Sequence, residues 1–222
     1  MMSIKKYIKE HKEIKLMIFY IIFIILFALI QKFIIPKYPN LVTSEIDYIM
    51  PYNKYFILAY ALWWPFVPVA FIFFYFRDTK SFKALCFQMF TVCFFTLYIY
   101  IIYPSYLDLR RPITENDIFS NMILWLRSID PPRNVYPSLH VSETLSICYV
   151  VYFCKDKILT KPVKYICFIS GILIIVSTIL IDQHAISDIV FAIVLSLIAL
   201  LSCPSFEDSD SSNLVDGGED AS

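Results

Sequence analysis

The chain has 222 residues, of which 59% are hydrophobic and only 17% are charged, and its formal net charge at pH 7 is zero. The apolar share lies well above the roughly 45–50% of soluble domains, and the mean hydropathy is +0.65. These values exclude an ordinary soluble domain, and the balanced charge gives no field that would attract nucleic acid or an acidic partner. We therefore expect a protein that lies in a bilayer and binds no nucleic acid.

Apolar stretches recur along the chain, and their lengths approach the roughly 20 residues that a helix needs to cross a bilayer. There are six of them: 16–35, 55–76, 84–103, 138–154, 164–182 and 185–203. Because the apolar runs are continuous rather than alternating, they predict helices and not the strands of a closed barrel. The predicted fold is all-α, an integral membrane bundle of six transmembrane helices.

The two ends of the chain differ from this apolar body in composition. Residues 1–15 carry five lysines, and the apolar run behind them is longer than the core of a signal peptide, which has about 7–15 residues. They predict a basic cytoplasmic segment before a retained signal anchor. Residues 204–222 are acidic and rich in Ser and Gly, so we expect a disordered tail. Residues 16–203 are predicted to form the membrane domain.

The lysines and arginines predict which loops face the cytoplasm, because these residues accumulate on that side. With the N-terminus inside, twelve of them fall on the inner side and seven on the outer side. This orientation places the loop 104–137 and the turn 182–184 together on the outer side. We therefore expect a multi-pass membrane protein whose candidate site faces outward.

The long outer loop contains one further amphipathic segment. Residues 117–127 place Ile118, Met122 and Trp125 on one helical face, which predicts a short helix at the membrane interface with Trp125 at headgroup depth.

The six cysteines lie almost wholly within the apolar stretches and show no paired spacing. We expect them to pack as small apolar residues and to form neither a disulfide nor a zinc site.

A histidine stands at the start of the fourth apolar stretch, in Pro137-Ser138-Leu139-His140. An ionisable group at a membrane edge is costly to keep and is a functional-site hypothesis by default. Pro137 is predicted to occupy the first helical turn, where free backbone amides and the Ser138 hydroxyl would bind phosphate. The alternative is that Ser138 is a simple helix cap and His140 an interfacial histidine.

A second histidine, His184, opens the sixth stretch and is followed four residues later by Asp188. This spacing puts both side chains on one helical face, where a carboxylate fixes the tautomer of an imidazole and stabilises its charged form. His184 is thus a candidate nucleophile; the alternative is a polar pair that packs the bundle.

Arginines complete the set of candidates. Arg111, followed by the stiffening Pro112, offers a planar fork suited to phosphate oxygens, although it can equally be an ordinary loop residue. With the two histidines on the same side, it favours phosphate chemistry at the outer surface of the membrane.

These elements resemble a known family. Arg111-Pro112, then Tyr136 to Ser142 (YPSLHVS), then Ser177-Thr178 with His184 and Asp188 are similar to the three signature motifs of the type 2 phosphatidic acid phosphatase (PAP2) superfamily. The segment 130–140 and the run 63–68 (WWPFVP) resemble its bacterial PAP2-like members and the inositolphosphotransferase branch, which includes inositol phosphorylceramide synthase.

The resemblance implies a six-span fold and a role for each matching residue. His184 would attack phosphorus and form a phosphohistidine, supported by Asp188, and His140 would protonate the leaving oxygen. Arg111, Ser138 and the local amides at Leu139 would hold the phosphoryl oxygens. The substrate would be a phosphorylated lipid, and neither a metal nor another cofactor would be needed.

The chain departs from the phosphatase motifs at three positions: Pro104 replaces a lysine, Thr178 an arginine and Leu139 a glycine. These changes match the transferase-like branch better, and fewer cations suit a phosphodiester with a single charge. Arg110 or Arg133 would then replace a missing cation.

Glu143 follows His140 by three residues on the same helical face. A carboxylate within an apolar stretch is costly unless it is paired. We expect Glu143 to contact His140, Arg110 or Arg133.

Three alternatives remain open. The acceptor is either water, in a phosphatase, or an alcohol, in a headgroup phosphotransferase. A non-catalytic PAP2-like protein that binds or transports lipid is a rival from another class. Two histidines and one aspartate would also supply a three-ligand metal site, but Arg111 beside them fits phosphate better. The identity of the lipid and the oligomeric state are left open by the sequence.

Overall fold

The computed structural model describes residues 12–35, 39–155, 157 and 159–203, and these residues are mostly helical, so the all-α prediction is confirmed. The elements in chain order are η1 (Lys12–Leu16), α2 (Met17–Phe33), β1 (Asn40–Leu41), α3 (Glu45–Tyr48), η2 (Lys54–Phe56), α4 (Ile57–Ala61), α5 (Trp63–Arg77), α6 (Thr79–Ile102), β2 (Ser105–Tyr106), α7 (Ile118–Ile129), α8 (Leu139–Phe153), α9 (Lys161–Leu180) and α10 (Ile186–Leu201). The tail predicted over 204–222 and most of the basic segment 1–15 lie outside the described residues.

Within the described residues, four helices are long and apolar enough to cross a membrane. They are Lys12–Phe33, Lys54–Arg77, Thr79–Ile102 and Lys161–Leu180. The remaining two apolar stretches form α8 and α10, which are apolar but have only 15 and 16 residues. These shorter helices are the two that begin at the candidate histidines.

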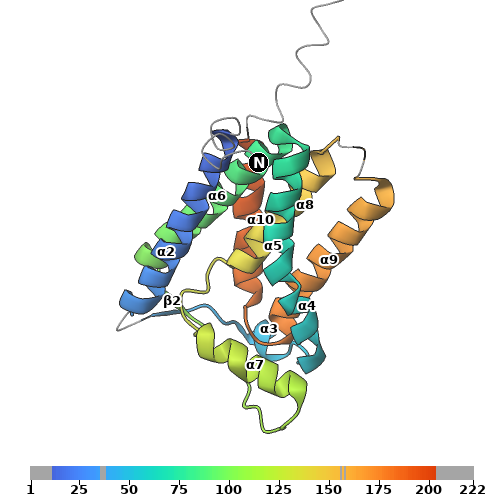
Figure 1. Ribbon diagram of the computed structural model, residues 1–222. Helices are drawn as coiled ribbons and strands as arrows, with labels where there is room; N and C mark the ends of the chain where they lie inside the picture. The colour runs from blue at the N-terminus through green and yellow to red at the C-terminus, as the bar shows by residue number, and fades with distance from the viewer. Residues whose placement is uncertain (1–11, 36–38, 156, 158, 204–222) are drawn as a thin grey trace, which may run out of the picture.

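Helix α8 lies at the centre of the bundle, packed against α5, α6, α9 and α10 (Figure 1). Its buried hydroxyls bond to its own backbone, since Ser142 Oγ donates to the Ser138 carbonyl and Ser146 Oγ to the Ser142 carbonyl, each over 2.9 Å. Such bonds let small polar residues sit inside an apolar bundle. A Cβ atom at Gly171 of α9 would lie 2.8 Å from Cys148 Sγ, so glycine allows the close approach of α9 to α8.

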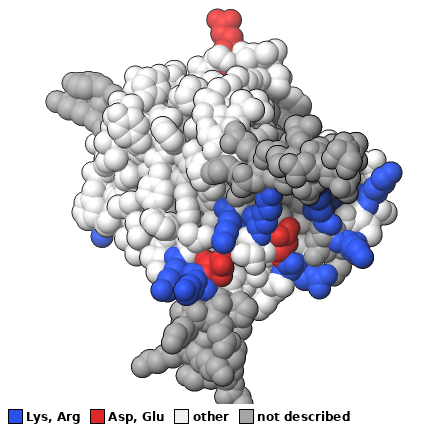
Figure 2. Space-filling model, turned by 90° about the horizontal axis from the view of Figure 1, so that it is seen from above, with Lys and Arg blue, Asp and Glu red and all other residues white. Residues whose placement is uncertain are grey.

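Basic residues gather at one end of the bundle, where α2 begins, α5 turns into α6, and α8 is followed by α9 (Figure 2). They are Lys12, Lys15, Arg77, Lys80, Lys83, Lys155, Lys157, Lys161 and Lys164. Lys83 Nζ lies 3.5 Å from Glu13, and Lys164 donates to the carbonyls of Tyr152 and Cys154. We call this the basic end.

The opposite end is covered by loops and short elements. Strands β1 and β2 pair in parallel there, with Asn40 opposite Ser105, and α7 lies across the end of the bundle (Figure 1). The short helix expected over 117–127 is confirmed as α7, which Asp117 caps by accepting from two backbone amides. Ile123 of α7 is buried, whereas Trp125 is 59% exposed, in keeping with an interfacial position.

Candidate functional site

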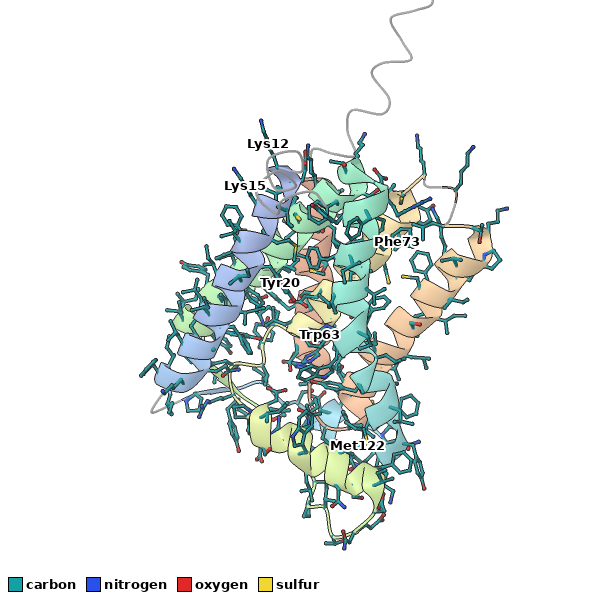
Figure 3. All side chains as sticks on the ribbon, in the orientation of Figure 1. Lys12, Lys15, Tyr20, Trp63, Phe73 and Met122 are labelled. Atoms are coloured by element: carbon teal, nitrogen blue, oxygen red, sulfur yellow. The ribbon has the colours of Figure 1, made fainter. Side chains whose placement is uncertain are left out.

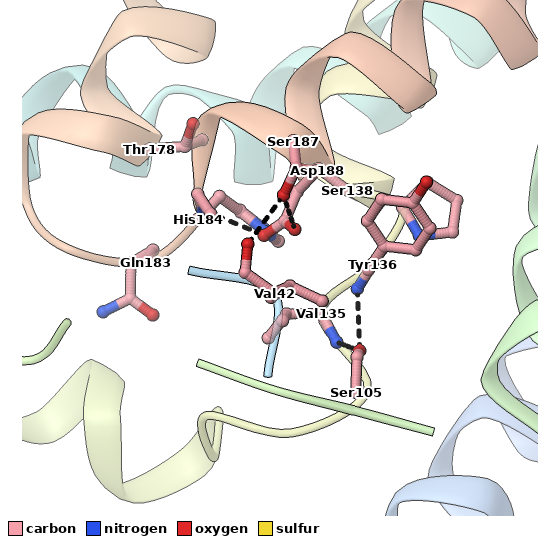
Figure 4. A network of polar contacts seen from close by, with 12 residues as sticks. Val42, Ser105, Val135, Tyr136, Ser138, Thr178, Gln183, His184, Ser187 and Asp188 are labelled. Carbon is pink, nitrogen blue, oxygen red and sulfur yellow. Dashed lines mark hydrogen bonds and ion pairs between the residues drawn. The ribbon is translucent and has the colours of Figure 1, made fainter. Parts of the chain in front are cut away.

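The two histidines meet at this second end of the bundle. Their ring centroids are 5.6 Å apart, and His184 Nε2 lies 3.4 Å from His140 Nδ1. The predicted contact between His184 and Asp188 is present, with 3.1 Å between Nδ1 and Oδ2 (Figure 4). Asp188 is fully buried and also accepts from the Ala185 amide. Two segments 44 residues apart in the chain therefore build one chain of contacts that ends on a buried carboxylate.

A tyrosine extends this chain on the other side. The Tyr60 hydroxyl of α4 lies 2.7 Å from His140 Nε2, and the Trp63 ring packs 4.4 Å from the His140 ring. One assignment of protons satisfies every contact: Tyr60 donates to His140 Nε2, His140 Nδ1–H donates to His184 Nε2, and His184 Nδ1–H donates to Asp188. In this assignment His184 Nε2 is unprotonated, as a nucleophile requires, but its lone pair accepts from His140 and becomes free only when the two rings separate.

The turn before α10 holds His184 through backbone contacts. The amides of Gln183 and His184 both donate to the Thr178 carbonyl at the end of α9. Asp182 has a φ of 58°, in the left-handed region that Asp tolerates better than most residues. The Ile186 amide donates to the Asp47 carboxylate over 2.7 Å, so α3 fixes the start of α10.

The segment before α8 is fixed in the same way. Ser105 Oγ of β2 accepts from the amides of Val135 and Tyr136 over 3.0 and 3.1 Å (Figure 4). The Ser138 amide donates to the Asp188 carbonyl, which ties the first turn of α8 to α10. The positions of the two histidines are thereby coupled through the backbone as well as through their rings.

Ser138 and its neighbours differ from their predicted roles. The Ser138 side chain is fully buried and accepts from the Val141 amide, so its hydroxyl acts as a helix cap. The prediction that Pro137 occupies the first helical turn is wrong, because Ser138 is the cap and α8 begins at Leu139. Leu139 is itself buried.

The two adjacent arginines are placed differently. Arg111 Nη2 donates to the Met50 carbonyl, and its Nε lies 3.7 Å from Asp182. Arg110 instead donates from Nη2 to the Asp130 carbonyl over 2.7 Å and to Gln183 Oε1 over 2.8 Å. Arg110 thus contacts the residue directly before His184, whereas Arg111 supports the turn from outside.

Several buried donors in this region, Arg127 Nε and Trp63 Nε1 among them, make no hydrogen bond to the described residues, and two of them lie close to His184 in the chain or through a contact. Arg110 Nε and Gln183 Nε2 are buried and have no hydrogen-bond partner among the described residues. A buried donor without a partner costs free energy, and an anion bound there would remove that cost. Gln183 was not among the predicted site residues, and its amide bears no sequence signal beyond its place next to His184.

Charges around the turn affect its carboxyl groups. Burial raises the pKa of Asp182 above its usual value, although the Arg111 amide and guanidinium and the Arg127 guanidinium oppose the shift. Burial likewise raises the pKa of Asp130, against the effects of His184 and Arg110. Burial lowers the pKa of Arg110 itself. The site is therefore poorly hydrated, a setting in which electrostatic interactions are strong.

Arg133 and Glu143 are not where they were expected. Arg133 Nη2 donates to the Gln31 carbonyl at the end of α2, away from the histidine pair. The Glu143 carboxylate is 1% exposed and contacts the Tyr20 hydroxyl and Cys93 Sγ. The predicted partners of Glu143 were therefore wrong, because its side chain points toward α2 and α6, whereas Arg110 and Arg133 lie in the loops at the end of the bundle.

A cavity of about 360 Å³ leads to the histidine pair, and we call it the histidine groove. Its walls are mostly apolar and come from α2, α4, α5, α7 and α8. Its lining residues are Tyr20, Phe23, Ile24, Phe27, Tyr60, Trp63, Trp64, Leu126, Ile129, Asp130, Leu139, His140 and Glu143. Figure 3 shows Tyr20 on α2 and Trp63 on α5, the two helices that flank this groove.

Within the described part of the chain, no group of three or more His, Cys, Asp and Glu side chains is arranged to hold a metal ion. No family model, no curated protein and no solved structure matches the chain. The function is therefore inferred from the geometry of this site.

Proposed function

We propose that the protein is a membrane enzyme of the PAP2 type, which moves the phosphoryl group of a phosphorylated lipid through a phosphohistidine on His184. One observation carries the proposal: the contacts from Asp188 to His184 and on to His140, over 3.1 and 3.4 Å. A carboxylate, an oriented imidazole and a second imidazole are the groups that nucleophilic transfer with acid–base assistance requires.

The first step forms the covalent intermediate. His184 Nε2 attacks phosphorus, the bond from phosphorus to the lipid oxygen breaks, and His140, which enters the step as an imidazolium, gives one proton to that leaving oxygen and becomes neutral. Asp188 accepts from His184 Nδ1–H and stabilises the positive charge that develops on the ring. In the second step, water or an alcohol loses its proton to His140 and attacks phosphorus, which releases His184.

The reaction requires the histidine rings to separate. An in-line arrangement of attacking nitrogen, phosphorus, leaving oxygen and donor nitrogen spans roughly 6 Å, whereas the two nitrogens lie 3.4 Å apart. His140 is the ring that we expect to move, since its polar partners are the Tyr60 hydroxyl and the other histidine, whereas His184 is also held by the buried Asp188 carboxylate over 3.1 Å.

The unpartnered donors support a place for the phosphoryl oxygens in this proposal. Arg110 Nε and Gln183 Nε2 are buried donors on the His184 side of the pair. Donors of this kind, preorganised in a site with little water, stabilise the charge of a phosphoryl transition state. The histidine groove, which approaches His140 from the apolar side, would hold the hydrocarbon part of the lipid.

This function places the protein in the membrane with the site at the outer leaflet. All six apolar helices would cross the bilayer, with the shorter α8 and α10 beginning at the site. The basic end would face the cytoplasm, as positively charged loops do, and the host membrane would be the bacterial cell membrane.

Transfer to an alcohol is the second candidate. Thr178 and Pro104, which replace cations of the phosphatase motifs, bring no charge to the site: Thr178 Oγ1 donates to the Ile175 carbonyl, and the Pro104 carbonyl accepts from Asn40. A site with fewer cations suits a phosphodiester substrate and hence a headgroup phosphotransferase.

The purified protein should be incubated with ³²P-labelled phosphatidic acid and with ³²P-labelled phosphatidylinositol, in the presence of EDTA. We expect an acid-labile label on the wild-type protein and none on His184→Ala. Release of phosphate without an added alcohol identifies a phosphatase, and a strict need for the alcohol identifies a transferase. Thr144→Val, a change in a buried hydroxyl on α8, is the control and should label like the wild type.

A protein that binds both lipids but takes up no label would contradict the proposal. That outcome would favour the non-catalytic lipid-binding or transport function. Loss of labelling in EDTA, restored by a divalent cation, would favour a metal-dependent hydrolase.

A further inference from the structure

A buried carboxyl group in the histidine groove has no part in the proposed chemistry. Glu143 lines the groove together with His140 and is only 1% exposed. The Tyr20 hydroxyl lies 3.2 and 3.3 Å from its two oxygens, and Cys93 Sγ lies 3.3 Å from one of them. Among the described residues, no lysine or arginine forms an ion pair with it. A carboxyl group held in this way, without a cation, is expensive to keep in an apolar bundle.

The contacts with Tyr20 and Cys93 use only part of the hydrogen-bond acceptor capacity of Glu143. An ionised carboxylate can accept about four hydrogen bonds, whereas Tyr20 and Cys93 bring one proton each. The remaining acceptor capacity lies next to the groove, since Tyr20 and Glu143 both belong to its wall. Among the described residues only Tyr20 and Cys93 donate to this carboxylate, and the Trp63 Nε1 donor in the same wall makes no hydrogen bond.

Glu143 lies deeper in the bundle than His140, on the same helix. Three residues on a helix correspond to about 4.5 Å along its axis, so the carboxylate lies almost one turn farther into the bundle than the acid–base histidine. Consider a bound lipid whose leaving oxygen contacts His140. Its atoms two or three bonds beyond that oxygen lie at the depth of the Glu143 carboxylate. These atoms carry the first substituents of the lipid backbone.

We propose that Glu143, held by Tyr20, accepts a hydrogen bond from a hydroxyl or N–H group of the lipid next to its phosphoester. The groove thereby selects lipids that carry such a donor over fully esterified lipids, which have none. This inference rests on the proposed function and adds the chemical class of the substrate to it.

The charges of the groove agree with this selection. Asp130, a second carboxyl group, lines the groove as well, and its walls contain no lysine or arginine. A lipid body that is neutral or carries an amine fits such walls, whereas additional negative charge is repelled. Arg110 contacts Gln183, the residue before His184, and the Asp130 carbonyl, and the phosphoryl group is proposed to bind beside it.

The test uses two phosphate monoesters that differ in one donor: 1-oleyl-glycerol 3-phosphate, with a free hydroxyl at C2, and its 2-O-methyl ether. For the wild type we expect kcat/KM to be about tenfold higher for the hydroxyl compound, as one hydrogen bond to a charged acceptor gives. Glu143→Leu should reduce this ratio to less than about twofold. The control Thr144→Val should keep the wild-type ratio.

A binding measurement separates this inference from the proposed function. Dissociation constants for both compounds are obtained from the fluorescence of Trp63 and Trp64 in His184→Ala, with and without Glu143→Leu. A preference for the hydroxyl compound that disappears with Glu143→Leu supports the inference even if no variant shows turnover, in which case only the proposed function fails. Equal rates and equal affinities for the two compounds in proteins with Glu143 overturn the inference, as does the absence of binding.

Glu143→Gln provides a second test in case the Glu143→Leu variant does not fold. It keeps the volume and replaces the charged acceptor by a neutral one, so its ratio should lie between those of the wild type and Glu143→Leu. The inference is also overturned if both Glu143→Gln and Glu143→Leu keep the wild-type ratio of kcat/KM for the two compounds. If Glu143→Leu does not fold, a wild-type ratio in Glu143→Gln alone overturns it.

Discussion

Two of the grooves along α2 differ in what lies at their inner ends. The histidine groove has a volume of about 360 Å³ and reaches His140 and Glu143. The second, which we call the apolar groove, is larger at about 640 Å³. It is lined by Leu26, Leu29, Ile30, Phe33, Ile34, Phe94, Leu97, Tyr98 and Ile101 of α2, α6 and the residue after α2.

The comparison shows that size and apolar walls do not identify a site in a membrane bundle. Helices that face lipid leave apolar grooves wherever two of them diverge, and such grooves fill with lipid chains. A site needs convergent polar groups in addition to the apolar walls. In this molecule those groups are the histidines and Tyr60, with Arg110 and Gln183 behind them. Substitutions that remove one of these polar groups, or that fill one of the two grooves, test this distinction.

The largest effect is expected for the cation behind the histidines. Arg110→Gln should lower kcat by about 10²- to 10³-fold, as the loss of one preorganised donor to a developing charge does. Arg111→Gln should lower kcat by about tenfold or less, because Arg111 bonds to Met50 and Asp182 instead. Both variants are measured by phosphate release, with thermal unfolding as the control for folding. A larger loss in Arg111→Gln would show that the phosphoryl group binds on the other side of the turn.

The next effect concerns the tyrosine that orients His140. Tyr60→Phe removes the hydroxyl that lies 2.7 Å from His140 Nε2 and keeps the ring. We expect kcat to fall about tenfold with KM unchanged, because the hydroxyl contacts the histidine. Tyr98→Phe is the matched change in the apolar groove and should leave both constants unchanged. A rise in KM without a fall in kcat would mean that Tyr60 binds the lipid.

A matched pair of substitutions on α2 compares the grooves directly. Ile24 lines the histidine groove and Leu26 the apolar groove, and both side chains are partly exposed. Ile24→Trp should lower kcat/KM for a long-chain lipid about fivefold by filling the groove, and should leave a small soluble phosphoester unaffected. Leu26→Trp should change neither rate. Equal effects of the two substitutions would contradict the assignment of the histidine groove.

The smallest effect is a pH dependence of stability. Because burial raises the pKa of Asp130 in the folded protein, its contribution to stability is present below the ordinary carboxyl value of about 4. That contribution is lost as the pH rises through the raised value. Asp130→Asn removes this loss, so its Tm relative to the wild type should increase with pH over that window by about 2–4 °C. The exposed Asp108→Asn serves as the control, and a Tm difference that does not change with pH would contradict the prediction.

Much of the fold followed from short-range patterns in the sequence. Continuous apolar runs predicted the helices, and the amphipathic pattern of 117–127 predicted α7. The contact between His184 and Asp188 is present as predicted, but not on a shared helical face, because His184 lies in the turn before α10 and Asp188 in its first turn. The prediction of six transmembrane helices is confirmed only in part. The helices α8 and α10 are shorter than the other four apolar helices, since residues at their starts belong to the site.

The remaining features of the site depend on how loops fold, which spacing does not encode. Arg110 and Arg111 are adjacent, and only the path of the loop decides which of them contacts Gln183. Tyr60 reaches His140 from 80 residues away and has no local signal. Glu143 was recognised as a costly group, but its partners lie on α2 and α6, so they follow from the packing of the bundle.

The short length of α8 has a consequence for the membrane around it. Its 15 residues extend about 22 Å, against a hydrocarbon core of about 30 Å. If α8 crosses the bilayer, as the proposed function requires, either the bilayer thins beside it or the histidines lie several ångströms below the level of the lipid headgroups. In the second case a lipid phosphate would have to descend to reach them, and a thinner bilayer would shorten that descent. The proposed function therefore predicts that turnover rises when the acyl chains of the surrounding lipids are shortened.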